Sequence, residues 1–213
     1  MNPIYTAVQV AILLFSVIAH EYAHGWMADR HGDHTARAMG RLTFNPVPHI
    51  DIFGTIILPL ICLITPGQFL IGWAKPVPVN PSYLNDPQRD MKWVSLAGPG
   101  ANFLLAVIAA SIMWGIRTVS FVPQSMAGSV YIIMQYVLVI NVVLPVFNLI
   151  PIPPLDGSRV LMALLPPRAA YAYAQWERYG FTLIILLMVT GVLWRIVGPV
   201  AGFIIYYLGG SSL

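Results

Sequence analysis

Residues 4–28 read IYTAVQVAILLFSVIAHEYAHGWMA, and Glu21 is the only charged residue among them. As an α-helix this stretch would be about 37 Å long at 1.5 Å per residue, which exceeds the roughly 30 Å hydrocarbon core of a bilayer. It is not typical of a cleaved signal peptide, because no basic residue precedes it and no small-residue processing site follows its apolar part. The stretch therefore predicts a first membrane-spanning helix with a polar cluster, His20 to His24, toward its C-terminal end.

The composition of the chain excludes a soluble globular protein. Of the 213 residues, 58% are hydrophobic and 9% are charged, with a mean hydropathy of +0.74, whereas soluble domains carry about a quarter of charged residues. The 11 Lys and Arg residues are scattered between apolar runs, so the net charge of +3 does not indicate nucleic-acid binding. The single cysteine, Cys62, excludes an internal disulfide and a multi-cysteine zinc site. Any metal must therefore be held by His and carboxylates.

Three further apolar stretches are long enough to cross a bilayer: residues 91–116, 127–150 and 179–208. Arg195 interrupts the last, which fits either one tilted helix or a helix followed by an interfacial segment. No internal repeat or long soluble insert is visible in the sequence. We therefore expect an all-α polytopic membrane protein with about four to five transmembrane helices, forming a single membrane-embedded domain over residues 1–213.

Residues 41–74, between the first two spans, are predicted to form a re-entrant, β-hairpin-like element. The apolar run 52–64 is too short for a full crossing and contains Pro59, and turn residues and a short β-like run follow it. A return to the same side also places most basic residues on one face, which the positive-inside rule assigns to the cytoplasm. That face would carry Arg30, Arg37, Arg41, Lys75, Arg89, Lys92, Arg159, Arg168 and Arg178, which leaves Arg117 and Arg195 toward the other.

The polar cluster of the first span has the pattern H-E-x-x-H. Four residues separate His20 from His24, so on a helix their imidazoles project within about 40° of each other and can share one metal ion. Glu21 would then act as the general base on the attacking water. The alternative is a structural cluster of interhelical hydrogen bonds. The metal is favoured because a charged group inside a span costs about 2.5 to 3.5 kcal/mol, and no nearby basic residue of this helix neutralises Glu21.

Asp156 is the best candidate for the third protein ligand that a catalytic zinc site requires. It follows a proline-rich break after the third span and precedes a short apolar helix at 160–165. It could instead be the N-cap of that helix, and the two roles are compatible because a carboxylate has two oxygens. Asp156 can meet the histidines only if residues 52–73 return to the side that they left. The other acids considered belong to loops or span ends: Asp29, Asp33, Asp86, Asp90 and Glu177.

Two asparagines within or at the end of spans, Asn102 and Asn148, allow two interpretations. Each could be an interhelical hydrogen-bonding residue, or each could bind the substrate backbone or the oxyanion near the metal. The short β-like runs at 40–45 and 70–74 also allow two interpretations. They could form a structural hairpin, or their exposed strand edge could pair with an unwound substrate segment. The remaining histidines are predicted to be solvated loop residues: His31, His34 and His49.

Taken together, these motifs resemble the site-2 protease family of intramembrane zinc metalloproteases. The matching segments, in the family's order, are His20 to His24, Gly98 to Asn102, and Asn148 to Gly157. The resemblance implies one Zn²⁺ per chain and a re-entrant β element between the first two core spans. The absence of a PDZ insert and of a CBS domain resembles the minimal prokaryotic branch. The implied ligands are His20, His24 and Asp156, with Glu21 as catalytic acid and base, and with Asn102 and Asn148 as supporting residues.

The expected function is hydrolysis of peptide bonds within or near transmembrane segments of membrane protein substrates, as in regulated intramembrane proteolysis. The expected partners are such a substrate and the membrane lipids, with no nucleic acid. We expect an integral protein of a prokaryotic inner or plasma membrane, with its active site toward the cytoplasm. A metal-ion or proton transporter would use the same His, Glu and Asp cluster, but the inverted repeats typical of transporters are not visible. A silent membrane scaffold would tolerate the loss of Glu21, which is present.

Overall fold

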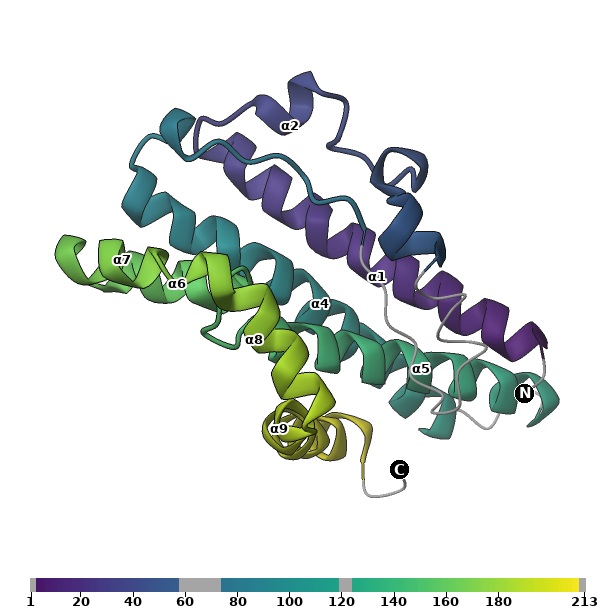
Figure 1. The fold of residues 1–213 in the computed structure, drawn as a ribbon. Helices are drawn as coiled ribbons and strands as arrows, with labels where there is room; N and C mark the ends of the chain where they lie inside the picture. Colours follow the sequence, from purple (N-terminus) through teal and green to yellow (C-terminus); the bar gives the residue numbers. More distant parts are fainter. Residues whose placement is uncertain (1–2, 58–73, 119–123, 211–213) are drawn as a thin grey trace.

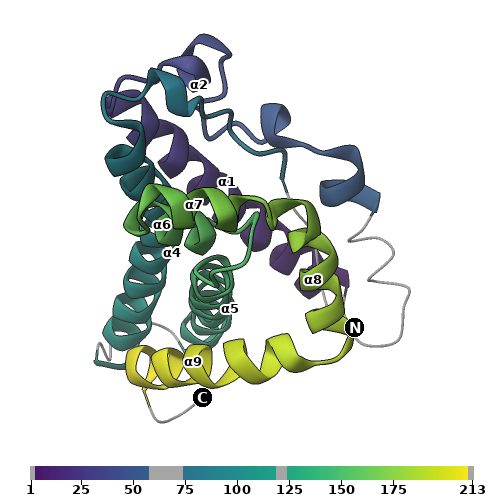
Figure 2. The ribbon, with the colours of Figure 1, turned by 60° about the vertical axis from the view of Figure 1, so that its left-hand side comes forward.

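The computed structural model describes residues 3–57, 74–118 and 124–210. Three long helices lie side by side in both views of the ribbon (Figures 1 and 2): α1 (Pro3–Arg30), α4 (Pro87–Thr118) and α5 (Gln124–Asn148). Four helical stretches are long and apolar enough to cross a membrane, namely Ile4–Arg30, Pro87–Thr118, Ala127–Asn148 and Val192–Gly209. The predicted all-helical architecture and the first three spans are therefore confirmed within the described residues.

The predicted fourth span, 179–208, consists of two helices. α8 (Glu177–Val189) ends shortly before Gly191, and α9 (Val192–Gly209) begins directly after it. Gly191 has φ +73°, a conformation that costs glycine little and cannot continue a helix. The break therefore falls at Gly191 and not at Arg195. α9 crosses α5, which is seen nearly end-on in Figure 2 while α9 runs across the view.

The core is formed where α4, α5 and α9 meet. Small side chains of α4, such as Ala106 and Ala109, are buried against Leu138 of α5 and Val197 of α9. Small residues at a helix interface let the backbones approach closely, as is common between helices in membranes. Large apolar side chains point outward from the same helices and are exposed, as expected for faces that contact lipid: Phe103, Leu104, Trp114, Ile196, Phe203 and Tyr207.

The chain between α1 and α4 contains short helical elements: α2 (Thr35–Ala38), η1 (Val47–His49), η2 (Ile52–Ile57) and η3 (Pro81–Tyr83). Its two halves meet, because the backbone N–H of Lys75 donates to the carbonyl of His49 at 2.8 Å. The N–H of Asn85 likewise donates to the carbonyl of His31 at the end of α1, also at 2.8 Å. The end of α1 and the start of α4 therefore lie at the same end of the bundle.

The predicted β-hairpin-like element is wrong where the structure describes it. Residues 41–46 are irregular, residues 52–57 form a π-helix, and the β-like run at 70–73 lies outside the described residues. Side chains occupy backbone donors there, since Thr43 Oγ1 accepts from the N–H of Asn45, and Asn45 Oδ1 accepts from that of Val47. Such local bonds compete with a strand ladder, and the prolines of this stretch supply no N–H.

Two short helices follow α5 at this same end: α6 (Asp156–Leu164) and α7 (Pro167–Ala174). α6 begins four residues earlier than predicted, and its N-cap is Leu155. Asp156 is therefore the first residue of the helix and not its cap. α6 packs against α4. The carboxylate of Asp156 is free to point toward His20 and His24 of α1.

Candidate metal centre

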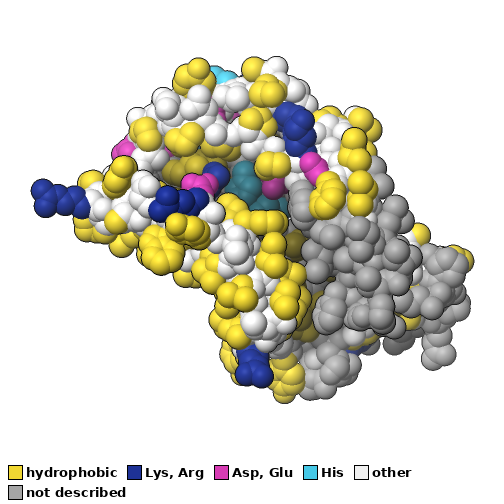
Figure 3. Space-filling model, viewed as in Figure 1, with side chains coloured by type: hydrophobic (Ala, Val, Ile, Leu, Met, Phe, Trp, Pro, Cys, Tyr) yellow, Lys and Arg dark blue, Asp and Glu magenta, His cyan; other side chains and the backbone are white. Residues whose placement is uncertain are grey.

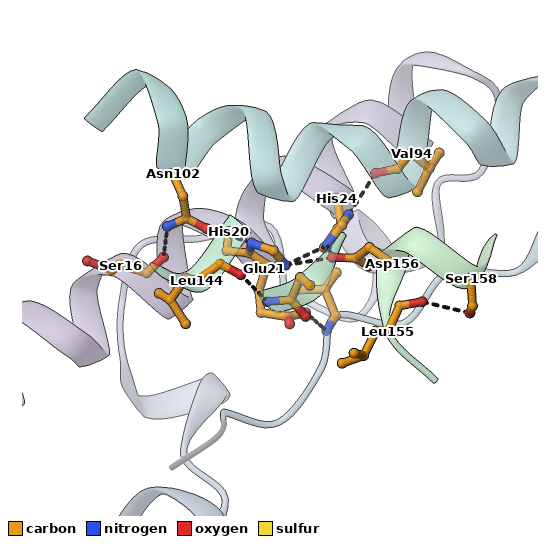
Figure 4. Close-up of polar contacts among 12 residues, drawn as sticks. Ser16, His20, Glu21, His24, Val94, Asn102, Leu144, Leu155, Asp156 and Ser158 are labelled. Atoms are coloured by element: carbon orange, nitrogen blue, oxygen red, sulfur yellow. Dashed lines mark hydrogen bonds and ion pairs between the residues drawn. The ribbon is translucent and has the colours of Figure 1, made fainter. Parts of the chain in front are cut away.

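Three side-chain atoms from α1 and α6 converge on one point. His20 Nε2 lies 3.0 Å from Asp156 Oδ2, His24 Nε2 lies 3.3 Å from the same oxygen, and the two Nε2 atoms are 3.0 Å apart (Figure 4). Both histidines are buried and Asp156 is half-buried. Within the described residues, this is the cluster of His and carboxylate groups that could hold a metal ion.

The triangle of atoms has the dimensions of a zinc site. Zinc binds imidazole nitrogen and carboxylate oxygen at about 2.0–2.2 Å, so two ligand atoms of a tetrahedral site lie roughly 3.3 Å apart. The three observed separations are 3.0, 3.0 and 3.3 Å. Two neutral imidazoles and one carboxylate are also the donor set that catalytic zinc uses, with one position left open. The residues present therefore fit a zinc ion.

At Gly98, the backbone of α4 lies directly against the imidazoles of His20 and His24. A Cβ atom at this position would lie 2.7 Å from His20 Nε2 and 2.6 Å from His24 Cε1, and it would overlap His24 Nε2. No side chain can occupy that space while both histidines keep their positions. The absence of a side chain at Gly98 therefore lets α4 pack directly against the pair of imidazoles.

His20 is fixed from behind by a buried polar network on α1, α4 and α5. Its Nδ1 lies 2.7 Å from Asn102 Oδ1, and Asn102 Nδ2 donates to the carbonyl of Ser16 at 3.0 Å (Figure 4). Asn102 Nδ2 also donates to Asn141 Oδ1 at 2.8 Å. Asn141 Nδ2 donates to Ser16 Oγ at 2.8 Å and to the carbonyl of Val137 at 2.9 Å. Ser16, Asn102 and Asn141 are all fully buried.

The direction of these hydrogen bonds determines the tautomer of His20. A backbone carbonyl can only accept, so the Asn102 amide nitrogen faces Ser16 and its oxygen faces the imidazole. Nδ1 of His20 is then the protonated nitrogen, and the lone pair of Nε2 points to the centre. The same logic applies to His24, whose Nδ1 donates to the carbonyl of Val94 at 2.7 Å.

Asp156 is held as an anion by its two neighbours. Burial raises the pKa of this carboxyl, but its close contacts with the imidazoles of His20 and His24 lower the pKa more, so that it lies well below its usual range. An ionised carboxylate is the form that binds a metal. The short helix α6 supplies the position, because Asp156 stands at its first turn, where a negative charge is favoured by the helix dipole.

Glu21 faces the same pocket from α1. One of its oxygens, Oε2, accepts a hydrogen bond from the backbone N–H of Val77 at 2.8 Å. The pocket has a volume of about 190 Å³ and is lined by His20, Glu21, His24 and Asp156, together with the segment Pro76 to Val79. Figure 3 shows a hollow in the surface with acidic and basic side chains at its rim and histidine at its floor. A wider hollow of about 380 Å³ adjoins it and shares Val79, Pro154 and Arg159.

The two candidate asparagines occupy different places. Asn148 lines the pocket, and its amide nitrogen donates to the carbonyl of Leu144 at 3.0 Å. Asn102 lies behind His20, where it holds the imidazole, and it is not among the residues that line the pocket. Three further residues at the centre were not predicted as functional: Ser16, Ser95 and Asn141. A polar residue in an apolar run is the signal that could have singled out each of them.

The loop histidines are less solvated than predicted. His49 is fully buried and its Nε2 contacts the carbonyl of Thr43 at 3.0 Å. His31 Nδ1 lies 3.0 Å from Asp90 Oδ1, so this histidine joins the ends of α1 and α4. His34 is the exposed one, and its Nδ1 lies 2.8 Å from Asp29 Oδ1.

Comparison with known proteins identifies relatives over most of the chain. The family model for Peptidase family M50 matches residues 8–124 and 113–190. A Bacillus subtilis (strain 168) protein named "Putative zinc metalloprotease YwhC" is 38% identical over 186 residues, which cover 85% of this chain and 80% of the relative. A Mycolicibacterium smegmatis protein named "Putative zinc metalloprotease Rip2" is 31% identical over 198 residues, 87% of this chain and 68% of that relative.

A more distant match is the "Zinc metalloprotease MJ0392" of Methanocaldococcus jannaschii, 22% identical over 194 residues that cover 90% of this chain and 45% of that protein. No solved structure matches the chain. The chain belongs to Peptidase family M50, the site-2 protease family that its motifs resemble.

Proposed function

We propose that this chain is an intramembrane zinc metalloprotease that hydrolyses peptide bonds within or near transmembrane segments of other membrane proteins. The observation that carries the proposal is the convergence of His20, His24 and Asp156 within 3.3 Å of one another, beside Glu21 of the apolar helix α1. Zinc is the proposed ion because the three atoms fit it and because the relatives are named as zinc metalloproteases. One ion per chain would be held by the two Nε2 atoms and Asp156 Oδ2.

In this proposal the bound zinc supplies Lewis-acid polarisation of the scissile carbonyl. Glu21 takes a proton from the attacking water and later delivers it to the leaving amine. The hydrogen bond from Val77 N–H occupies Oε2 of Glu21, so Oε1 is the oxygen that remains for the water. Asn148, in the wall of the same pocket, is positioned to hydrogen-bond the substrate.

The family and the four apolar helices make this chain an integral membrane protein. His20 lies ten residues from the end of α1, about 15 Å deep at 1.5 Å per residue. We propose that the pocket opens toward the cytoplasm, because nine of the basic residues lie in or next to the segments that connect α1 to α4 and α5 to α8. In a prokaryotic plasma membrane, residues 1–213 would act as one catalytic domain on a transmembrane substrate, in contact with lipid and without nucleic acid.

The alternative of a metal-ion or proton transporter is not favoured. The relatives are named as metalloproteases, and the polar cluster is concentrated in one pocket at one end of the bundle. A transporter would be expected to divide such residues between two corresponding halves.

The decisive experiment combines zinc analysis with a cleavage assay on a model transmembrane substrate in detergent or nanodiscs. The purified wild type should contain one zinc and cleave the substrate. Glu21→Gln should keep the zinc and lose cleavage, because the amide cannot accept the proton. Asp156→Ala should lose affinity for zinc and lose cleavage. Undiminished cleavage by Glu21→Gln would refute the mechanism.

The orientation is tested separately. A reporter fused after Asn85 should be cytoplasmic, because this residue lies beside His31 at the end of α1. A reporter that reads as external would refute the proposed orientation of the pocket and leave the chemistry untouched.

A further inference from the structure

Ser95 of α4 carries a buried hydroxyl that has no hydrogen-bond partner among the described residues. The residue is 1% exposed, and it lines the pocket that contains His20, Glu21 and His24. Buried polar groups in proteins are nearly always hydrogen-bonded, and leaving one without a partner costs free energy. A hydroxyl of this kind in the wall of a candidate active site is therefore available for something that enters the site.

Other hydroxyls on the helices of this protein do not behave in this way. Ser111, also on α4, donates to the carbonyl of Val107 at 2.8 Å, and Thr190 donates to that of Leu186 at 2.8 Å. Each uses the carbonyl one turn back along its own helix, which is the usual solution for Ser and Thr in a helix. Ser95 leaves that solution unused, so its buried hydroxyl, in a residue that lines the pocket, keeps its hydrogen-bonding capacity.

The position of Ser95 places this hydroxyl close to the candidate metal centre. Gly98, three residues further along α4, touches both imidazoles, and residues three apart on a helix have their Cβ positions about 5–6 Å from each other. Val94, directly before Ser95, accepts the Nδ1 proton of His24. An extended peptide advances about 3.3–3.6 Å per residue, so a carbonyl bound by this hydroxyl would belong to a residue one or two positions from a peptide bond held at the centre.

The chemistry of the pocket indicates what the hydroxyl would bind. Glu21 and Asp156 contribute carboxylate oxygens, so acceptors are plentiful in the wall. A peptide carbonyl that enters is itself an acceptor and needs a donor. Arg159 supplies a charged donor at the junction with the wider hollow, and Ser95 supplies a neutral one beside His24.

We propose that Ser95 is a substrate-binding residue whose hydroxyl donates a hydrogen bond to a main-chain carbonyl of the unwound substrate, one or two residues from the scissile bond. This assignment rests on the proposed protease function. A main-chain contact is independent of the substrate side chain, so Ser95 contributes affinity for an extended backbone rather than sequence preference.

The test measures binding apart from cleavage. In the Glu21→Gln background, the dissociation constant for a labelled transmembrane peptide is compared with and without Ser95→Ala, and kcat and KM are compared in the active enzyme. Loss of one neutral hydrogen bond should weaken binding and raise KM by about twofold to tenfold. Zinc content should not change. Ser111→Ala removes a hydroxyl from the same helix away from the pocket. Its dissociation constant and KM should equal those of the protein without this substitution.

Ester substitution in the peptide locates the partner, because an ester carbonyl is a weaker acceptor than an amide. One ester position next to the scissile bond should weaken binding when Ser95 is present and have a smaller effect with Ser95→Ala. Equal dissociation constants and KM values for Ser95→Ala and Ser111→Ala would overturn the proposal, as would loss of zinc in Ser95→Ala. Failure of the wild type to cleave would instead refute the protease function, and the comparison in the Glu21→Gln background would still decide the role of Ser95.

Discussion

Asn102 Oδ1 lies 2.7 Å from His20 Nδ1, although 82 positions of sequence separate the two residues. The asparagine can accept this hydrogen bond because its amide nitrogen is already committed to Ser16 and Asn141. The orientation of one imidazole at the centre thus depends on a polar network that spans three helices. Residues that hydrogen-bond a metal-ligating histidine from behind hold it in the correct tautomer and orientation.

The first prediction concerns Asn141, which does not touch the imidazole. Asn141→Leu removes one of the two acceptors of Asn102 Nδ2 and leaves the Asn102 side chain held by the carbonyl of Ser16 alone. We expect zinc affinity to fall by about 10- to 100-fold, as is typical for residues behind a metal ligand. The measurement is competition for zinc with a chelator of known affinity.

Gln135→Leu is the matched control, because it makes the same chemical change on the same helix, α5, outside the network. A zinc affinity for Asn141→Leu equal to that of Gln135→Leu would show that the network is not coupled to the centre. Histidine ¹⁵N shifts of the metal-free protein give a second measurement, since Asn141→Leu should increase the Nδ1-unprotonated form of His20.

The second prediction concerns the closest approach of α4 to the centre. Gly98→Ala would place a methyl group 2.7 Å from His20 Nε2, within the space where the ion binds. Both zinc binding and cleavage should be lost, while the helices still assemble. Gly100→Ala should have little effect, because nothing lies within 4 Å of a Cβ at that position. Zinc bound equally by the two variants would contradict the described geometry of the centre.

Much of this architecture could be predicted from the sequence, because a bilayer makes long apolar runs and isolated acids informative. The histidine pair follows from helix periodicity alone. Asp156 could be predicted to join it once the topology was assumed. The fourth span is predicted less well, because the sequence interrupts it with a charge at Arg195, whereas the helix breaks at Gly191, whose φ is +73°.

Other features depend on contacts that a single sequence does not reveal. The run at 40–45 has a β-like composition, but the side chains of Thr43 and Asn45 accept hydrogen bonds from backbone N–H groups that a strand ladder would need. Asn141 and Ser16 are ordinary polar residues in apolar helices until they are found to share Asn102. Their role is a property of three helices together.

The third prediction concerns Asp33, which joins the loop after α1 to the segment that reaches Glu21. This buried carboxylate accepts from the N–H groups of Thr35 at 3.0 Å and of Asn80 at 2.6 Å. Asp33→Asn replaces one carboxylate oxygen by an amide nitrogen. That NH₂ group would face the backbone N–H of Thr35 or of Asn80, which should cost about 1–3 kcal/mol of stability. A lower melting temperature and weaker cleavage with unchanged zinc content are expected. Asp86→Asn, at the exposed start of α4, is the control.

The fourth prediction concerns how the segment that binds Glu21 is seated on α1. Gly25 lies one turn after Glu21, and a Cβ there would come 2.7 Å from Val77 Cγ1 and 3.3 Å from Ala36 Cβ. Gly25→Ala should therefore push Val77 away and break the hydrogen bond from its N–H to Glu21 Oε2, so that kcat falls while zinc content stays constant. Val77→Ala removes the clashing methyl group and keeps the backbone N–H. The double variant Gly25→Ala/Val77→Ala should thus recover kcat, because the segment can return to α1. If the double variant were as slow as Gly25→Ala alone, contact with Val77 would not be the cause of the loss.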